Sequence, residues 1–259
     1  HIPLSDALPM MENMGLRILS EHPYVMVLSG GNIYIQDFEV VPERRPDFDL
    51  DALKDAFQQA FERIWRGDAE NDGFNDLILA AGLDWRQTAM LRACCKYLLQ
   101  TGVPFSQAYM EQTLCKYPLH ARLLVELFEA KFDPAREQPS RTVADAARKR
   151  MARELAPLFG EEMDRLHPHL IESLGAVRGE ARERQVEAAV KAIGAVMDSV
   201  ESVDEDRILR SFMAVIRACL RTSFYQLHDG RPREVVGYKL DTSKLPDLPK
   251  PRPYREIFV

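Results

Sequence analysis

The cysteines are the side chains best suited to metal binding or nucleophilic chemistry, but their spacing supports neither. The chain contains no CxxC pair and no framework of regularly spaced cysteines. Cys94 and Cys95 are adjacent in an apolar helical pattern, so their side chains point in different helical directions and do not share a metal. We therefore predict buried, reduced thiols at all four positions, Cys94, Cys95, Cys115 and Cys219.

The histidines also lack the spacing of metal ligands. His167 and His169 flank Pro168 and do not form the i, i+4 pair that places two imidazoles on one face of a helix. Three further histidines have no Cys, Asp or Glu at ligand spacing and are interpreted as surface or packing residues: His22, His120 and His228. No metal site is expected in this chain.

Motifs for catalysis or cofactor binding are missing from the sequence. No GxSxG elbow occurs, and the 40 Asp and Glu residues are mostly interleaved with Lys and Arg, so no carboxylate pair stands out. Dinucleotide binding requires closely spaced glycines between a strand and a helix, whereas Gly30-Gly31 separates two extended runs and indicates a hairpin turn. We predict no catalytic and no cofactor-binding residue here.

An arginine-rich helix face is the remaining candidate for a functional surface. Between Asp204 and Tyr225, apolar residues repeat at 3.6-residue spacing and arginines occupy the opposite face. The interpretation we favour is a solvated face, because exposed arginine is the norm. The alternative is docking against an acidic neighbouring surface, in which case the candidate interdomain contact consists of Arg207, Arg210, Arg217 and Arg221.

The elements that would position these residues begin with a small α/β piece. Ser5 is placed to cap a helix that ends near Gly15. Two extended runs follow, over 17–28 and 33–41. A single helix over one hairpin is marginally stable in water, so we expect a partner strand before residue 1.

The rest of the chain is predicted to be helical until it becomes extended near its end. Short helices are expected over 50–65, 74–81, 85–100, 105–117 and 119–132, and longer ones over 142–177, 180–200 and 204–225. Pro157 and Pro168 should bend or interrupt the helix that contains them. An apolar stripe over 186–200, which we expect to be exposed, predicts contact with another segment or subunit. Strand-like patterns over 235–240 and 254–259 predict pairing partners after Val259.

Together these patterns predict a mainly α protein with a small N-terminal α/β piece and a short C-terminal extended segment. We divide it into residues 1–45, a helical subdomain over 46–135, a long-helix subdomain over 136–228 and an extended segment over 229–259. The net charge of −6 disfavours nucleic acid as a partner. The lack of a membrane-length apolar run and of a signal peptide disfavours a membrane and predicts a cytoplasmic location.

Five stretches, spread over nearly the whole chain, resemble the large bacterial NAD-specific glutamate dehydrogenases. They are SDALPMMENMGLRILSEHPY (5–24), DGFNDLILAAGLDWRQTAMLRACCKYLLQTG (72–102), TLCKYPLHARLLVELFEAKFDP (113–134), DEDRILRSFMAVIRACLRTSFYQ (204–226) and KPRPYREIFV (250–259). None is a catalytic motif alone, and the resemblance depends on several distinctive segments that occur in the right order.

This resemblance implies a parent enzyme that oxidatively deaminates L-glutamate to 2-oxoglutarate and ammonium, uses NAD as hydride acceptor and forms a homo-oligomer. It implies that residues 1–45 are a partial ACT-like, ferredoxin-like piece without its first strand, with an amino acid as candidate effector. In that family the glutamate-binding segments, the catalytic lysine and the Rossmann domain follow the YREIFV-like strand. The chain is therefore expected to be a non-catalytic regulatory and assembly region that contacts the downstream catalytic domain.

A different class of function remains open from the residues alone. The chain could be a non-enzymatic helical scaffold or an amino-acid-sensing module that acts through protein contacts. A glycine- and lysine-rich segment followed by GxGxxG, further along the parent sequence, would distinguish the dehydrogenase from this alternative.

Overall fold

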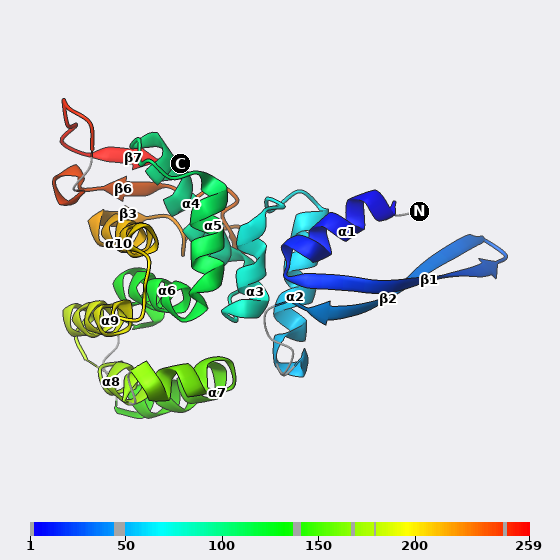
Figure 1. The fold of residues 1–259 in the computed structure, drawn as a ribbon, viewed down its shortest axis with the longest axis horizontal. Helices are drawn as coiled ribbons and strands as arrows, with labels where there is room; N and C mark the ends of the chain where they lie inside the picture. The colour runs from blue at the N-terminus through cyan, green and yellow to red at the C-terminus, as the bar shows by residue number, and fades with distance from the viewer. Residues whose placement is uncertain (1–2, 44–49, 137–140, 167–168, 179, 246–247) are drawn as a thin grey trace. The chain divides into compact units, whose positions relative to one another are not determined.

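A computed structural model describes residues 3–43, 50–136, 141–166, 169–178, 180–245 and 248–259. Helices dominate these residues, and small antiparallel sheets lie near both ends of the chain, as the sequence predicts. The contacts divide the chain into two compact units, residues 1–88 and 89–259, each of which is described by itself. Figure 1 shows the elements of both units.

The first unit begins with the predicted helix and hairpin. Helix α1 (Leu4–Asn13) leads into the antiparallel strands β1 (Leu16–Leu28) and β2 (Gly31–Pro42), which pair from Leu16 opposite Pro42 to Leu28 opposite Gly31. Only two residues connect the strands, as the glycine-rich turn predicts. The remaining elements are α2 (Leu50–Trp65), the short 3₁₀ helix η1 (Gly73–Asp76) and α3 (Leu77–Ala80).

Two predictions for this unit are wrong in detail. Ser5 does not cap α1, because the helix starts at Leu4 and contains Ser5. The extended backbone of Pro3 forms the N-cap, and the Pro3 carbonyl accepts from the amides of Asp6 and Ala7. The helix expected over 74–81 is a 3₁₀ turn followed by a single α-turn. The Asp72 side chain accepts from the Phe74 amide, so it starts the 3₁₀ turn as an N-cap residue.

The core of the first unit joins the α/β piece to the helices that follow. Met14 is buried with Ala60 and Ile64 of α2 and with Ile78 of α3. Gly15 has φ +80°, and a Cβ at this position would overlap the Asp76 carboxylate. Glycine is therefore required here both by the left-handed backbone and by the close approach of Asp76.

The second unit is a stack of helices. Its elements are α4 (Trp85–Gln100), most of which lies in this unit, α5 (Gln107–Lys116), α6 (Pro118–Phe132), η2 (Pro134–Arg136), α7 (Arg141–Leu166), α8 (Leu170–Ala176), α9 (Arg182–Met197) and α10 (Val203–Ala218). Helix α9 packs on α6, α8 packs on α9, and α7 packs on α8 (Figure 1).

The long-helix predictions are correct in part. In place of the single helix expected over 142–177, α7 ends at Leu166 and α8 begins at Leu170. His167 and Pro168 lie outside the described residues, so the expected effect of Pro168 stays a prediction. Helix α7 runs through position 157 without an interruption, and the other outcome expected for Pro157, a bend, stays a prediction. The apolar stripe of α9 is not exposed, because Ala189, Ile193 and Val196 are buried and the helix packs on α6.

The chain ends in a three-stranded antiparallel sheet. Its strands β3 (Cys219–Thr222), β6 (Tyr238–Leu240) and β7 (Glu256–Phe258) pair in the order β3-β6-β7. The minor elements between them are β4 (Leu227–His228), β5 (Arg231–Pro232) and η3 (Thr242–Lys244). The helix expected over 204–225 therefore ends at Ala218, because Cys219 is extended (φ −64°, ψ 124°) and pairs with Leu240.

Candidate functional site: the joint between helices and C-terminal sheet

The last strand is attached to α4 through Tyr97. The Tyr97 hydroxyl donates a hydrogen bond to the Glu256 carboxylate of β7. The Tyr97 ring meets Phe258 edge to face, with 5.7 Å between ring centroids and 73° between ring planes. Burial and then the hydrogen bond to Glu256 raise the pKa of Tyr97, so its hydroxyl stays protonated and available as a donor.

An aromatic cluster attaches α6 to the same sheet. Phe128 lies 5.2 Å from Phe224 and 6.4 Å from Tyr238 of β6, measured between ring centroids. Phe224 in turn makes an edge contact with Tyr225 at 5.0 Å. Aromatic pairs at such distances contribute about 0.5–1.5 kcal/mol beyond the burial of their surface. Helix α6 is thus fixed against residues that lie about a hundred positions later in the sequence.

Lys131 of α6 closes the C-terminus of α10. Its ammonium donates to the carbonyl oxygens of Ile216 at 3.0 Å and Arg217 at 2.7 Å, and also to that of Cys219. The last carbonyls of a helix have no partner within the helix, and the helix dipole makes this end favourable for a cation. Lys131 therefore sets the point where α10 ends and β3 begins, while burial lowers the pKa of Lys131 to about 8.

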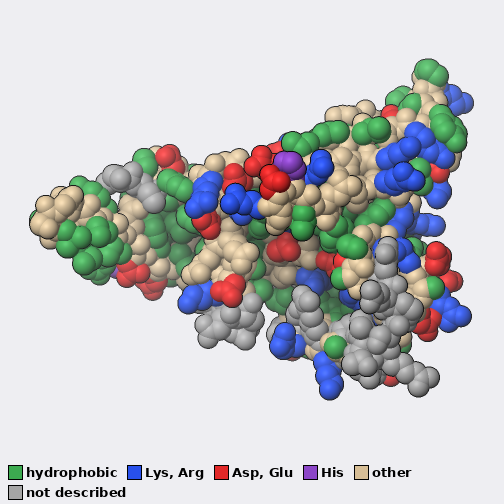
Figure 2. Space-filling model, turned by 180° about the vertical axis from the view of Figure 1, so that it is seen from behind, with side chains coloured by type: hydrophobic (Ala, Val, Ile, Leu, Met, Phe, Trp, Pro, Cys, Tyr) green, Lys and Arg blue, Asp and Glu red, His purple; other side chains and the backbone are tan. Residues whose placement is uncertain are grey.

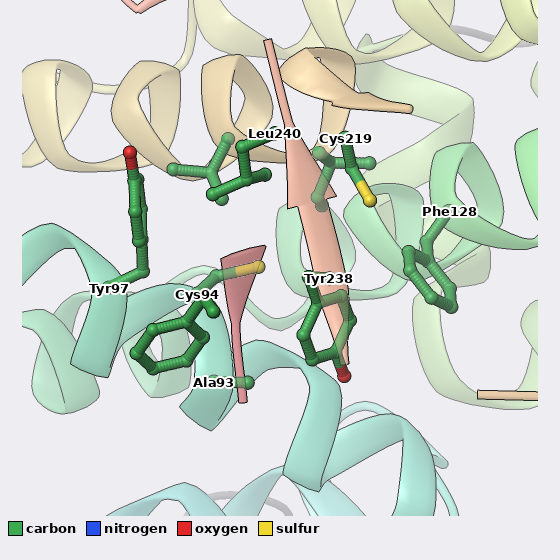
Figure 3. Close-up of a pocket in the computed structure, with 10 residues that line it drawn as sticks. Ala93, Cys94, Tyr97, Phe128, Cys219, Tyr238 and Leu240 are labelled. Carbon is green, nitrogen blue, oxygen red and sulfur yellow. The ribbon is translucent and has the colours of Figure 1, made fainter. Parts of the chain in front are cut away.

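Two cysteines face one apolar hollow at the centre of the joint. Figure 3 shows Cys94 of α4 and Cys219 of β3 beside this hollow, with Phe128, Tyr238 and Leu240 also lining it. Burial raises the pKa of both thiols, to about 11 for Cys219. A thiol that stays protonated is a poor nucleophile and a poor metal ligand. All four cysteines are buried, which confirms the predicted packing role, while their reduced state stays a prediction.

The structure divides the predicted arginine face into two groups. Arg207, Arg210 and Arg217 lie exposed on α10, whereas Arg221 lies on β3 opposite Lys239. Arg210 is held by both carboxylate oxygens of Asp206, at 2.8 and 2.9 Å. The guanidinium of Arg207 lies 5.7 Å from the centre of the Phe105 ring. Interdomain contact through these arginines stays a prediction.

Sequence reasoning missed two ionic contacts that hold the helices together. Glu205, in the first turn of α10, is buried and accepts from Lys116 at 2.8 Å and Tyr117 at 2.7 Å. Arg136 is buried with Glu126, at 2.8 Å, and with Glu129. The sequence gives no sign of these contacts. Glu205 is 88 positions from Tyr117, and Arg136 follows its helix without a helical spacing that would pair it with Glu126.

The described histidines show no metal site. His120 is buried, and its Nε2 lies 2.9 Å from the carbonyl oxygen of Val196. Burial lowers its pKa, despite the opposite effect of that hydrogen bond. The other described histidines are exposed, as expected for surface residues: His22, His169 and His228. Within the described residues, no three His, Cys, Asp or Glu side chains are grouped to hold a metal, and no helix has the length and apolar character required to span a membrane.

Three family models match consecutive parts of the chain. Residues 1–53 match the ACT3 domain of glutamate dehydrogenase, residues 69–134 match helical motif 3 of glutamate dehydrogenase, and residues 192–259 match the catalytic domain of bacterial NAD-glutamate dehydrogenase. The joint described above is therefore a contact between the helical-motif match, which contains Tyr97, Phe128 and Lys131, and the catalytic-domain match.

Relatives named NAD-specific glutamate dehydrogenase are similar over essentially the whole chain. The protein from Halomonas elongata is 38% identical over 259 residues, the one from Pseudomonas aeruginosa 36% over 260, and the one from Mycobacterium tuberculosis 35% over 266. The chain covers only 13–14% of the length of these relatives. In sequence and in the order of its parts, the chain belongs to the family of large bacterial NAD-specific glutamate dehydrogenases.

Proposed function

We propose that this chain connects a regulatory module to the catalytic domain of an NAD-specific glutamate dehydrogenase and carries out no chemistry itself. In this proposal the parent protein oxidatively deaminates L-glutamate to 2-oxoglutarate and ammonium, with NAD as hydride acceptor, and is a homo-oligomer. The order of the family matches supports the proposal, because the ACT-type match and the catalytic-domain match lie at opposite ends of the chain.

The observation that carries the proposal is the packing of the helical motif on the segment that matches the catalytic domain. Tyr97 holds β7, Phe128 packs on β6, and Lys131 closes α10. Closely packed side chains transmit small displacements instead of absorbing them. A shift of α4 or α6 would therefore move the sheet at the start of the catalytic domain.

A second contact supports the same role at the other end of the helical motif. Asn13 of α1 donates to the side chain of Asn71 at 3.0 Å, and Gly15 packs against Asp76 without room for a side chain. The first residue of each pair belongs to the ACT3 match and the second to the helical-motif match. The helical motif thus has close contacts with both of the regions that it would connect.

Within this proposal we keep the functional division made from the sequence. Residues 1–45 are the ACT-like piece, 46–135 and 136–228 are helical connector segments, and 229–259 lead into the catalytic core. Arg217 and Arg221 are the better candidates for contact with an acidic neighbouring domain, because Arg210 already pairs with Asp206. Arg221→Glu should lower the melting temperature of the full-length enzyme and leave that of the isolated chain unchanged.

The groove in the first unit does not favour an amino acid as the effector. It has a volume of about 650 Å³ and is lined by α1, the hairpin and α2. Its lining side chains carry no charge; they include the apolar Met11, Ile33 and Phe57 and the polar Asn32 and Gln36. A zwitterion would lose its hydration there without gaining a charged partner for its ammonium or its carboxylate group. Effector binding by this piece stays a prediction. If it binds an amino acid, we expect the site to be on a different surface.

The proposal is tested by comparing the full-length protein that carries this sequence with the isolated chain. The full-length protein should reduce NAD when L-glutamate is supplied, and the isolated chain should form no NADH under the same conditions. A full-length protein without this activity would favour the alternative, a scaffold or sensing module. NADH formation by the isolated chain would overturn the non-catalytic assignment.

A further inference from the structure

Helices α7 and α8 form a helical hairpin that has apolar packing of its own. Figure 1 shows α7 beside α8, at the end of the stack that also contains α6 and α9. The contact between α7 and α8 is more extensive than the contact between α8 and α9. Helix α7 carries a row of buried apolar side chains at helical spacing, and α8 contributes two more: Met151, Leu155, Phe159 and Met163, with Leu170 and Leu174. The hairpin is thus packed more closely within itself than against α9.

Both ends of this hairpin bind one carboxylate of α6. Arg136, just before α7, donates to Glu126 Oε1 at 2.8 Å and to Oε2 at 3.1 Å. Arg178, just after α8, donates to the same Oε2 at 2.7 Å. Gln185 of α9 donates to the backbone carbonyl of Arg136 at 3.2 Å. The chain therefore enters and leaves the hairpin at one place, which we call the root and define as Glu126, Arg136, Arg178 and Gln185.

The charges of the root are buried. Charged side chains normally stay in water, and Figure 2 shows both signs on the surface of the molecule. At the root, the side chain of Arg136 is only 5% exposed, and those of Glu126 and Arg178 are 12% and 17% exposed. Salt therefore screens their attraction only weakly. Removing one partner from a buried ion pair is strongly destabilising, because the other charge is left without compensation.

The root also contains polar atoms that the protein itself does not satisfy. In the described part of the chain, four buried side-chain nitrogen or oxygen atoms make no hydrogen bond with another protein group, and three of them belong to the root: Arg136 Nε, Arg178 Nε and Gln185 Oε1. Arg136 Nε lies 3.6 Å from the Asp133 carboxylate, too far for a hydrogen bond. A buried donor or acceptor without a partner is costly, and opening the root to solvent would let water bind all three atoms. The root thus combines strong ionic contacts with a cost of staying closed.

We propose that the α7–α8 hairpin opens away from α9 as one unit, and that Glu126 is the latch that holds it closed. The hairpin lies between the two family matches in the sequence, because the helical-motif match ends at residue 134 and the catalytic-domain match begins at residue 192. The last residues of α9 belong to the catalytic-domain match, so the hairpin is a moving part beside the helix that leads into it. The inference does not rest on the proposed function, since every contact that it uses lies within this chain.

Two distances between spin labels, measured by double electron–electron resonance, test the two parts of the proposal. Labels at Asp164→Cys on α7 and Lys191→Cys on α9 report how far the hairpin is from α9. Labels at Asp164→Cys and Glu172→Cys, on α7 and α8, report the shape of the hairpin itself. All three positions are exposed, so the labels should not disturb the packing. The native cysteines are buried and should stay unlabelled in the folded chain.

The variant Glu126→Gln removes the charge of the latch and nearly keeps its shape. A second, longer 164–191 distance should appear, while the 164–172 distance should stay unchanged. Because two buried guanidiniums lose their shared carboxylate, the ratio of open to closed chains should rise roughly a hundredfold. The matched control is Arg184→Gln, which breaks an exposed ion pair with Glu180 close to the root. It should leave both distances as they are in the wild type.

An unchanged 164–191 distance in Glu126→Gln would overturn the assignment of Glu126 as the latch. A 164–172 distance that also lengthens or broadens would overturn movement as one unit, because the hairpin itself would then be unfolding. If circular dichroism shows that Glu126→Gln does not fold, Arg178→Gln decides the question, because it releases one end of the hairpin and leaves the Arg136–Glu126 pair in place. This variant should also show the longer 164–191 distance, and the wild-type distance alone would overturn the proposal.

Discussion

Replacing Tyr97 by phenylalanine removes one hydroxyl from the joint between α4 and the C-terminal sheet and leaves the ring in place. The hydroxyl donates to the Glu256 carboxylate, whereas the ring keeps its edge contact with Phe258. A hydrogen bond to a charged group contributes roughly 1.5–3 kcal/mol. Glu256 is half-buried, so water can replace part of the lost bond, and we expect a loss at the lower end, about 1.5 kcal/mol.

Hydrogen exchange of the β7 amides measures this loss locally. A change of about 1.4 kcal/mol in the free energy of local opening corresponds to a tenfold change in exchange rate, so residues 256–258 should exchange roughly tenfold faster. The matched control is Tyr254→Phe, because Tyr254 is 82% exposed and precedes the same strand. Unchanged exchange in Tyr97→Phe, or equal effects of the two variants, would refute the assigned role of Tyr97.

The pH dependence of stability provides a second view of the same residue. Burial, followed by the hydrogen bond to Glu256, raises the pKa of Tyr97 above its ordinary value of 10.0. The unfolded chain therefore loses this proton at lower pH than the folded chain does. Its contribution to stability is complete below pH 10 and decreases as the pH rises further. Denaturant unfolding should show a steeper alkaline loss for the wild type than for Tyr97→Phe.

Three further predictions concern residues that fix neighbouring elements. Lys131→Met should destabilise the chain by about 2 kcal/mol in urea unfolding, because three carbonyl oxygens lose a charged donor; a change below 0.5 kcal/mol, as we expect for exposed Lys239→Met, would contradict the capping role. Gly15→Ala should lower the melting temperature by several degrees, since the backbone is left-handed and Asp76 occupies the space of the Cβ. For His120, burial lowers the pKa below 6.5, so stability should fall as the pH drops below 6.5, and His120→Gln should flatten that decline.

The elements with strong local periodicity are the ones that the sequence predicts well. The hairpin follows from alternation and a glycine-rich turn, and α2, α4 and α6 follow from helical spacing. Each of these patterns is formed by residues that are close together in the sequence. Local reasoning did not decide between a bend and an interruption at Pro157. Helix α7 continues through this position, because surrounding helical residues can carry a helix through one missing backbone donor.

The joint could not be found from the sequence because its partners are far apart. Tyr97 and Glu256 are separated by 159 positions, and nothing in either segment indicates the other. The strand β3 shows the same limit: residues 219–222 continue a helical pattern, but pairing with β6 makes them extended. Tertiary contacts outweigh local preference there, and Arg221 consequently leaves the arginine face to which its spacing assigned it.

The most direct measurement of the central claim is a calorimetric titration of the isolated chain with NAD, alone and in the presence of L-glutamate. A connector without catalytic chemistry should give no binding heat in either titration, while the full-length protein should bind NAD under the same conditions. Saturable NAD binding by the isolated chain would contradict the account, because it would place a cofactor site within residues to which we assign none.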